Sequence, residues 1–335
     1  MRRAAGGESP GAAVIGAGPC GLAAAIALER AGIRATVFDR SCIVSSVASY
    51  PVYMTFFSTA EKIAIGGLPF VTAGDKPTRR EALAYYRLVV QHFGLTVRQY
   101  EPVVGLAREG GVFVVRAETV RGPVESRWDA VVIATGYFGT PNMLNVPGES
   151  LPHVTHVFRE GHQAFQRDVV VVGGGNSAVE SALDLWRAGA RVTVVHFKGT
   201  FDPNVKPWVL PDMANRIAEG SIAIRWHSRV TDIGADTVTV EDSTGGAERV
   251  SAQQVFLMTG FTPSSALLER IGVGIDRETG IPTHDPHTME TNVPGVFVAG
   301  VLVSGYDANK VFIENGRNHG DLIAGRILAR ARAAA

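Results

Sequence analysis

The sequence predicts an α/β fold with two Rossmann-like dinucleotide-binding domains, each with a parallel sheet and a β-meander, the second inserted into the first. Three observations support this prediction. A glycine-rich turn followed by a helix-forming run occurs twice, after the apolar residues 12–15 and 169–172. Each copy is followed by alternating polar and apolar residues and then by an apolar run that ends in Thr-Gly. The chain has 335 residues, which is enough for two domains of roughly 100–200 residues each.

The first copy covers residues 12–40. Its largely apolar residues 12–15 and 35–38 are expected to be strands of a parallel sheet that is buried on both faces. The Ala-rich residues between them are expected to form a helix that stops at Gly32, because glycine commonly follows a helix C-terminus.

The turn of the first copy is GAGPCG, residues 16–21, and it has the G-x-G-x-x-G spacing of a dinucleotide-binding loop. Gly16 allows the tight turn, Gly18 lets the backbone approach a pyrophosphate, and Gly21 lets helix and strand pack closely. The helix N-terminus offers unpaired N–H groups to the phosphates. Asp39 closes the next strand and would accept hydrogen bonds from ribose hydroxyls. A tight turn without a ligand is the alternative.

The second copy begins at Asp168 and contains GGGNSA, residues 173–178, the G-x-G-x-x-A variant of the same turn. His196 and Lys198 stand at the strand end where the first copy has its acid. Basic residues there would pair with a ribose 2′-phosphate, which an acid would repel, so NADP is favoured over NAD. The alternative, that both side chains belong to a solvated strand end, leaves NAD open.

Two different dinucleotide sites in one chain imply electron transfer between two cofactors, and the acid at the first site and the bases at the second fit FAD and NADPH. After the second copy come a buried run at 295–300 and a long helix expected at about 309–331. This remainder is too short for a further sheet, so we assign it to the first domain. The expected FAD-binding domain is residues 1–148 and 286–335, and the expected NADPH-binding domain is residues 149–285.

The composition excludes several classes of protein. Lys plus Arg and Asp plus Glu both number 32, so neither nucleic acid nor a membrane is an expected partner. No apolar run approaches the roughly 18 residues that a membrane helix needs. Cys20 and Cys42 are too few for a disulfide framework, and no Cys/His spacing predicts a metal site. A reduced, cytoplasmic protein is expected, and a homo-oligomer is left open.

Six segments are informative when taken together: GAGPCG (16–21), YPVYMTFFSTAEKIAIGGLPF (50–70), ATGYFGTPNMLNVPGE (134–149), GGGNSAVESAL (173–183), VKPWVLPD (205–212) and AGVLVSGYDANKVFIENGRNHG (299–320). With them the chain resembles the flavoproteins related to thioredoxin reductase and, more narrowly, the bacillithiol disulfide reductase group. TFFST and NKVFIENGR are the selective parts, because glycine turns are shared by very many flavoproteins. The resemblance implies that NADPH reduces FAD and that electrons then pass to a small-molecule disulfide, oxidised bacillithiol in the first place.

Some departures from the resembled proteins bear on function. Residues 149–285 contain no cysteine, so the redox C-x-x-C of thioredoxin reductases is absent. Val301 follows the late Ala-Gly where the wider superfamily has an Asp that holds the flavin ribityl chain. The resemblance implies Asp307 or Asn309 as the substitute.

Two further departures concern the coenzyme and the reaction. Phe197 replaces an Arg of the resembled group, which leaves Lys198 to compensate. FREGHQAF (158–165) fails the F-x-G-x-x-x-H spacing of flavin monooxygenases, which argues against oxygenation. A ferredoxin or flavodoxin reductase of the same kind is the alternative enzyme, and a redox sensor that binds FAD and NADPH without turnover is the alternative of another class.

Two roles of Cys20 remain open. It lies in the first turn of a predicted helix, where the dipole would lower its thiol pKa and favour attack on a disulfide. The resemblance supports this catalytic role, because a cysteine in this turn recurs in the resembled group. A small residue would equally fill the tight packing below the pyrophosphate. Cys42 has no motif around it and is expected to be structural.

The late helix is expected to begin near residues 307–310, and its positive dipole end would lie beside the flavin pyrimidine. Tyr50, Phe56 and Phe57 are expected along the flavin, with a plain core role equally open. The full set of expected cofactor-binding residues is Gly16, Gly18, Pro19, Gly21, Asp39, Arg40, Tyr50, Phe56, Val103, Thr135, Gly136, Gly173, Gly175, Asn176, Ser177, Ala178, His196, Lys198, Thr259, Gly260, Gly300, Asp307, Asn309 and Lys310.

Overall fold

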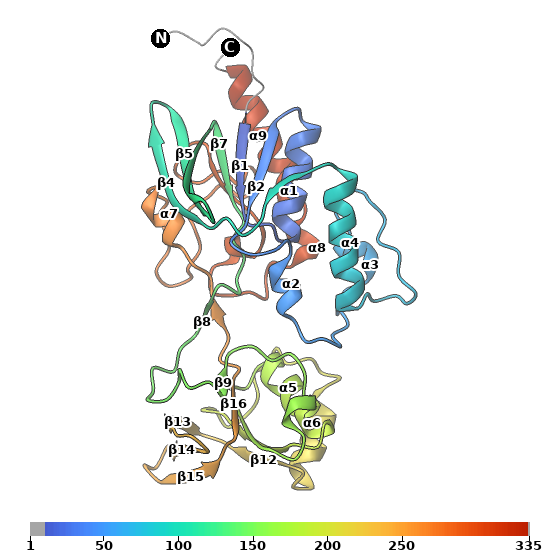
Figure 1. Ribbon diagram of the computed structural model, residues 1–335, viewed down its shortest axis with the longest axis vertical. Helices are drawn as coiled ribbons and strands as arrows, with labels where there is room; N and C mark the ends of the chain where they lie inside the picture. The colour runs from blue at the N-terminus through green and yellow to red at the C-terminus, as the bar shows by residue number, and fades with distance from the viewer. Residues whose placement is uncertain (1–10, 334–335) are drawn as a thin grey trace. The chain divides into compact units, whose positions relative to one another are not determined.

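The computed structural model describes residues 11–333, and these form two compact units (Figure 1). The first unit combines the described residues of three stretches, Met1–Ala48, Thr55–Thr140 and Thr262–Ala335. The second unit combines Ser49–Met54 with Pro141–Phe261. The second unit therefore interrupts the first along the chain.

The later boundary differs from the one expected from the sequence, because residues 262–285 belong to the first unit. They contain α7 (Ala266–Arg270), whose Leu268 is fully buried in a core cluster of the first unit. Arg270 Nη1 also donates a 2.7 Å hydrogen bond to Val104 O. Burial and hydrogen bonding thus attach this segment to the first unit.

A five-stranded parallel sheet forms the centre of the first unit. Its order is β18-β7-β1-β2-β3, and all neighbours run parallel. The first strand therefore lies in the middle, and the turn that follows it opens at the carboxyl edge of the sheet, where parallel α/β folds bind ligands. The strands are β1 (Gly11–Ile15), β2 (Arg34–Phe38), β3 (Thr96–Arg98), β7 (Ala130–Ile133) and β18 (Val296–Val298).

Helices and a β-meander accompany this sheet (Figure 1). Phe113 and Val115 of the meander share a buried cluster with Ala13 of the central strand. α1 packs against α9, and a Cβ on Gly320 would lie 2.6 Å from Ala24 Cα, so glycine allows this close approach. The elements are α1 (Pro19–Arg30), α2 (Ser45–Ser49), α3 (Ala60–Ile63), α4 (Arg79–His92), β4 (Val103–Glu109), β5 (Val112–Thr119), β6 (Gly122–Trp128), η2 (Gly300–Ser304), α8 (Ile313–Gly316) and α9 (His319–Ala333).

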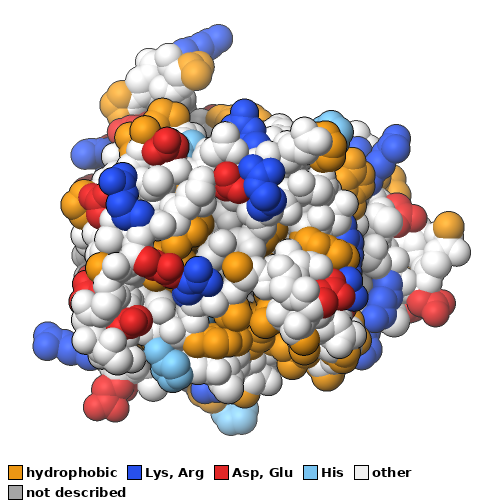
Figure 2. Space-filling view, turned by 90° about the horizontal axis from the view of Figure 1, so that it is seen from below, with side chains coloured by type: hydrophobic (Ala, Val, Ile, Leu, Met, Phe, Trp, Pro, Cys, Tyr) orange, Lys and Arg blue, Asp and Glu red, His pale blue; other side chains and the backbone are white. Residues whose placement is uncertain are grey.

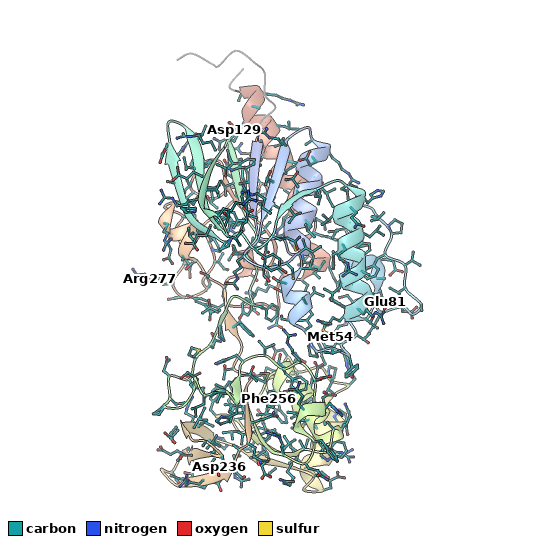
Figure 3. The ribbon with its side chains drawn as sticks, viewed as in Figure 1. Met54, Glu81, Asp129, Asp236, Phe256 and Arg277 are labelled. Carbon is teal, nitrogen blue, oxygen red and sulfur yellow. The ribbon has the colours of Figure 1, made fainter. Side chains whose placement is uncertain are left out.

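Two carboxylates fix the beginnings of elements in the first unit (Figure 3). Asp129 Oδ2 accepts a 2.8 Å hydrogen bond from Gly11 N at the start of β1. Glu81 Oε2 accepts one of 2.7 Å from Thr78 N, and Thr78 Oγ1 accepts one from Glu81 N, which is a complete capping box at the start of α4.

The second unit repeats this plan. Its parallel sheet has the order β12-β11-β10-β16-β9, and Phe256 of β16 contacts Phe158 with ring centroids 5.6 Å apart (Figure 3). The elements are β9 (Val154–Thr155), η1 (His162–Ala164), β10 (Asp168–Val172), α5 (Asn176–Arg187), β11 (Arg191–Val195), α6 (Leu210–Ala218), β12 (Ile222–Arg225), β13 (Ser228–Ile233), β14 (Thr237–Asp242), β15 (Ala247–Ser251) and β16 (Gln254–Leu257). The chain passes between the units on either side of Ser49–Met54 and again at the paired strands β8 (Thr140–Pro141) and β17 (Phe261–Thr262).

The late helix differs from the prediction. Residues 305–312 form turns and extended chain, and a helix begins only with the short α8; α9 follows after a break. Asp307 Oδ1 accepts a 3.1 Å hydrogen bond from Asn309 N, and Asn315 Oδ1 accepts one of 2.8 Å from Phe312 N. Asp and Asn side chains thereby satisfy backbone donors in a non-helical conformation, which competes with helix formation.

Glu290 is a buried carboxylate that ties α9 to the segment before β18. It is 8% exposed, and it accepts hydrogen bonds from Gly295 N at 2.8 Å, from Arg326 Nε at 2.6 Å and from Arg330. Burial alone would raise the pKa of Glu290, but the arginines and the Gly295 N–H outweigh it and lower the pKa. The carboxylate therefore stays charged and paired.

Replacing Glu290 by Ala is expected to lower the free energy of unfolding by about 1–3 kcal/mol, because charge-assisted hydrogen bonds are lost and a buried N–H loses its partner. The matched control is Glu125→Ala, which breaks an ion pair with Arg116 in which both side chains are more than half exposed. Such a pair is worth at most about 1 kcal/mol. Urea unfolding followed by circular dichroism measures both. Equal losses in the two variants would contradict the anchoring role.

Candidate active site

The first glycine turn is dictated by backbone crowding. Gly16 has φ +114°, and a Cβ there would lie 2.2 Å from Ala134 O. A Cβ on Gly21 would lie 1.9 Å from Gly16 O. By contrast, a Cβ on Gly18 would meet no other atom of the described chain within 4 Å. The space beside Gly18 is therefore open, and packing within the described chain does not require a glycine there.

The N-terminus of α1 opens onto the same space. Gly18 is the N-cap residue and offers no side chain, so the first N–H groups of α1 lack a side-chain cap. Pro19 occupies the first position of the helix, where its missing N–H costs nothing. Unpaired N–H groups together with the positive helix end make this a site for an anionic group.

Asp39 stabilises the turn from the end of β2. Its Oδ2 accepts a 2.8 Å hydrogen bond from Ala17 N, and its Oδ1 accepts one of 2.8 Å from Ser41 N. Burial raises the pKa of Asp39, whereas these two donors and Arg40 lower it less strongly. Each carboxylate oxygen keeps a free lone pair, so the side chain can still accept hydrogen bonds from a ribose.

The other expected residues of the first site follow neighbouring strands. Thr135 and Gly136 come after β7, and Gly300 comes after β18, so all three lie at the carboxyl edge of the sheet. Gly300 N donates a 3.2 Å hydrogen bond to His319 Nδ1 at the start of α9. We did not single out His319 from the sequence, although it lies in a segment that carries the family resemblance. Val103 begins β4.

The two selective sequence segments meet in the first unit. Ser58 Oγ donates a hydrogen bond to Glu314 Oε1, and Lys62 Nζ lies 3.8 Å from the same carboxylate. Arg317 Nη1 donates to Glu61 O at 2.7 Å and to Ala64 O at 2.5 Å. The segments that contain TFFST and NKVFIENGR are therefore joined by side-chain contacts.

The expected aromatic cluster is not assembled within one unit. Phe56 and Phe57 belong to the first unit, with 7% and 40% exposure. Tyr50 is assigned to the second unit, where Val52 N donates a 2.8 Å hydrogen bond to Arg159 O. Burial raises the pKa of Tyr50 to about 12, so its hydroxyl stays protonated.

Asp307, Asn309 and Lys310 lie in a turn rather than at a helix N-terminus. The expected dipole beside the flavin pyrimidine is therefore wrong for these residues, because α8 begins later and has only four residues. The turn is held instead by Tyr137, whose hydroxyl donates a 3.0 Å hydrogen bond to Tyr306 O.

Cys20 is enclosed by two glycines. A Cβ on Gly316 would lie 2.8 Å from its Sγ, and a Cβ on Gly300 would lie 3.3 Å from it. Burial raises the pKa of Cys20 to about 12, so the lowered pKa that we expected from the helix position is wrong. Desolvation outweighs the helix end here, and the thiol is protonated at neutral pH.

The second glycine turn has the same construction. Gly173 has φ +140°, and a Cβ there would lie 2.4 Å from Met258 O. A Cβ on Gly175 would make only an ordinary 3.6 Å contact with Asp202 Oδ2, so packing does not demand glycine at this position. Gly175 is the N-cap of α5 and has no side chain to cap it. The second turn thus also presents helix N–H groups without a side-chain cap. Asn176, Ser177 and the fully buried Ala178 are the first residues of this helix.

Several residues expected to bind the second cofactor form hydrogen bonds within the protein instead. Asn176 Oδ1 accepts a 2.9 Å hydrogen bond from Lys206 N, and its Nδ2 donates to Asn204 O. Thr259 Oγ1 donates a 2.6 Å hydrogen bond to Asn142 O, and Gly260 O accepts one from Asn142 N. These residues shape the loops around the turn.

His196 is not the exposed cation that we expected. It is 2% exposed, and a Cβ on Gly174 would lie 2.3 Å from its ring. Burial lowers the pKa of His196, and this effect outweighs the nearby Asp202 that favours the charged ring. Lys198 Nζ lies 2.6 Å from Asp202 Oδ1, so its charge is paired. The strand end is less basic than its sequence indicates.

A hollow of about 740 Å³ lies on the flank of α1 in the first unit. It contains no residue of the glycine turn, and Arg30 and Arg317 on its wall bond to backbone carbonyls. We therefore do not place cofactor chemistry in it. No group of three or more His, Cys, Asp or Glu side chains suited to a metal ion occurs within residues 11–333.

Comparison with known proteins decides the family. Residues 13–300 match the family described as pyridine nucleotide-disulphide oxidoreductase. The chain belongs to this family. Bacilliredoxin reductase Bdr from Bacillus subtilis (strain 168) is 44% identical over 322 residues, which cover 95% of this chain and 98% of that protein.

Solved structures agree with this membership. Bacillithiol disulfide reductase Bdr (YpdA) from Bacillus cereus has a TM-score of 0.93 and 43% identity, covering 96% of this oxidoreductase and 100% of that chain. The protein of the same name from Staphylococcus aureus has a TM-score of 0.89 and 38% identity, covering 97% and 99%. The predicted two-domain α/β fold and the predicted family resemblance are confirmed. The oxidoreductase is a flavin-dependent disulfide reductase, and its family implies a flavin and a nicotinamide cofactor.

Replacing Gly18 by Leu is expected to remove the flavin from the purified oxidoreductase, because the side chain would fill the open space beside the α1 N-terminus. The matched control is Gly74→Leu, since a Cβ there also meets no described atom within 4 Å but lies far along the chain from the turn. The visible flavin absorbance per mole of protein measures the outcome. A fully flavinylated Gly18→Leu protein would contradict the assignment.

Proposed function

We propose that this oxidoreductase uses NADPH and FAD to reduce a low-molecular-weight disulfide, oxidised bacillithiol in the first place. The overall reaction consumes NADPH, one proton and the disulfide, and it yields NADP⁺ and two thiols. The observation that carries the proposal is the pair of glycine turns, each with one glycine that packing does not require and that faces a helix N-terminus. The names of the relatives supply the substrate class.

FAD is proposed for the first turn and NADPH for the second. Gly18 and the α1 N-terminus would hold the pyrophosphate of FAD, and Asp39 would accept from its ribose. Gly175 and the α5 N-terminus would hold the pyrophosphate of NADPH. The bound flavin supplies the redox chemistry, accepting a hydride and passing on an electron pair. The protein's part is to bind and orient both groups.

We further propose that Cys20 is a packing residue. A thiol with a pKa of about 12 is almost wholly protonated at neutral pH and is a poor nucleophile. Its position beside Gly300 and Gly316 supports a role in filling space between α1, η2 and α8. On this proposal the disulfide receives its electrons from the flavin without a mixed disulfide on Cys20.

The face shown in Figure 2 has no concentration of basic side chains. On the face shown in Figure 2, acidic and basic side chains are interspersed among apolar ones, without segregation by sign. An acidic electron carrier would be recognised by a basic face.

No helix within residues 11–333 is both long and apolar enough to cross a membrane. We propose a cytoplasmic enzyme, because its two cysteines are free and no disulfide framework exists in the sequence.

Bacillithiol disulfide is expected to be reduced with a kcat/KM at least about tenfold above that for glutathione disulfide or cystine. A site that forms polar contacts with one disulfide loses them when a different disulfide binds, and its own polar groups are then left unpaired. The assay follows NADPH oxidation by the flavoprotein, with ferredoxin, flavodoxin and a bacilliredoxin as further acceptors. Turnover with ferredoxin or flavodoxin alone would favour the alternative reductase. Absence of flavin bleaching by NADPH under anaerobic conditions would favour a sensor without turnover.

Replacing Cys20 by Ala is expected to leave both half-reactions within about threefold of the wild-type rates, because Ala is a near-isosteric replacement for a half-buried thiol. Stopped-flow absorbance measures flavin reduction by NADPH and reoxidation by the disulfide separately. Cys42→Ala is the control for loss of a thiol elsewhere. Normal reduction followed by loss of disulfide-driven reoxidation in Cys20→Ala alone would make Cys20 the nucleophile.

A further inference from the structure

We propose that Arg229 is the main residue that recognises the 2′-phosphate of NADPH, with Phe197 holding its guanidinium in place. The inference rests on the proposed use of NADPH at the second glycine turn. Sequence reasoning assigned this role to His196 and Lys198, and it gave no signal for Arg229, which belongs to a different strand.

The backbone brings Arg229 to the end of β11. Parallel strands β11 and β12 end side by side, and the chain then turns into β13. Ser228 N donates a 3.1 Å hydrogen bond to His196 O, and His227 N donates one of 3.1 Å to Lys198 O. These bonds fix the first residues of β13 along the strand end, and Arg229 follows directly. The end of this second strand is where Rossmann folds read the adenosine ribose.

The two basic residues expected at this place are weak candidates. His196 is buried under the glycine turn, and its burial disfavours the charged ring. Lys198 forms a 2.6 Å ion pair with Asp202, so a phosphate would have to compete with a carboxylate already in contact. Neither side chain offers a free positive charge.

Arg229 has the properties that the other two lack. Its side chain is exposed, and its Cζ lies 4.7 Å from the centroid of the Phe197 ring. Glu241 is its cross-strand neighbour, yet no carboxylate among residues 11–333 lies within ion-pair distance of it. The ring face restrains the guanidinium without neutralising it, so its five donors remain available in a planar fork.

Phe197 has no role in the core. It is 49% exposed and stands at the edge between Lys198 and Arg229, with Lys198 Nζ 5.3 Å from its ring centroid. Here it contacts the exposed guanidinium at the strand end, and a guanidinium fork suits a bidentate contact with a phosphate.

The test is calorimetric binding to the purified flavoprotein. Arg229→Gln is expected to raise the Kd of NADP⁺ about 10- to 100-fold and to change the Kd of NAD⁺ less than about twofold, because only NADP⁺ carries the charged phosphate. The probes 2′-AMP and 5′-AMP should separate in the same way, with only 2′-AMP binding weakened. Lys198→Gln should cost less than Arg229→Gln.

The matched control is Arg249→Gln, which removes the same charge from β15 of the same three-stranded meander, where Arg249 Nη2 donates to Thr237 Oγ1. It should leave both affinities unchanged. If the wild-type protein prefers NADP⁺ but Arg229→Gln binds NADP⁺ with unchanged affinity, the role of Arg229 is overturned and the proposed coenzyme is not. A wild-type protein that binds NAD⁺ as tightly as NADP⁺ would overturn the proposed coenzyme as well.

Discussion

Backbone crowding at the two glycine turns is the constraint on which the rest of the site depends. At Gly21 and at Gly173 a single added carbon would lie within 2.4 Å of a carbonyl oxygen. At Gly21 the start of α1 is close to the end of β1, and at Gly173 the turn is close to the chain that follows β16. The N–H groups of α1 and α5 therefore emerge at the carboxyl edges of their sheets. A site for an anion follows from this closeness without any charged side chain.

The same crowding accounts for the chemistry of Cys20. The residue lies in the first turn of α1, and glycines at 300 and 316 let the neighbouring segments approach its side chain. Partial burial of the side chain removes water from the thiol and raises its pKa, although the helix end would favour a thiolate. The position of a cysteine in a helix therefore does not determine its thiol pKa, because the segments that pack against the thiol also affect it.

The sequence was informative where structure depends on neighbours along the chain. The apolar strands and the glycine turns are local patterns, and both were predicted. The helix expected from residue 309 failed because the Asp307 carboxylate bonds the backbone two residues on. The charge expected on His196 failed because its burial depends on Gly174, which comes from another segment. Arg229 was missed because only folding brings it beside Phe197.

The interrupted first unit has a consequence for synthesis of the chain. β7 pairs with β18, and α1 packs on α9, although the second member of each pair lies at the far end of the sequence. The ribosome releases Pro141–Phe261 before either of them. The second unit can therefore be complete while β7 still presents an unpaired edge, which is the kind of edge that mispairs with other chains. The part of the protein that is made first is the last to finish folding.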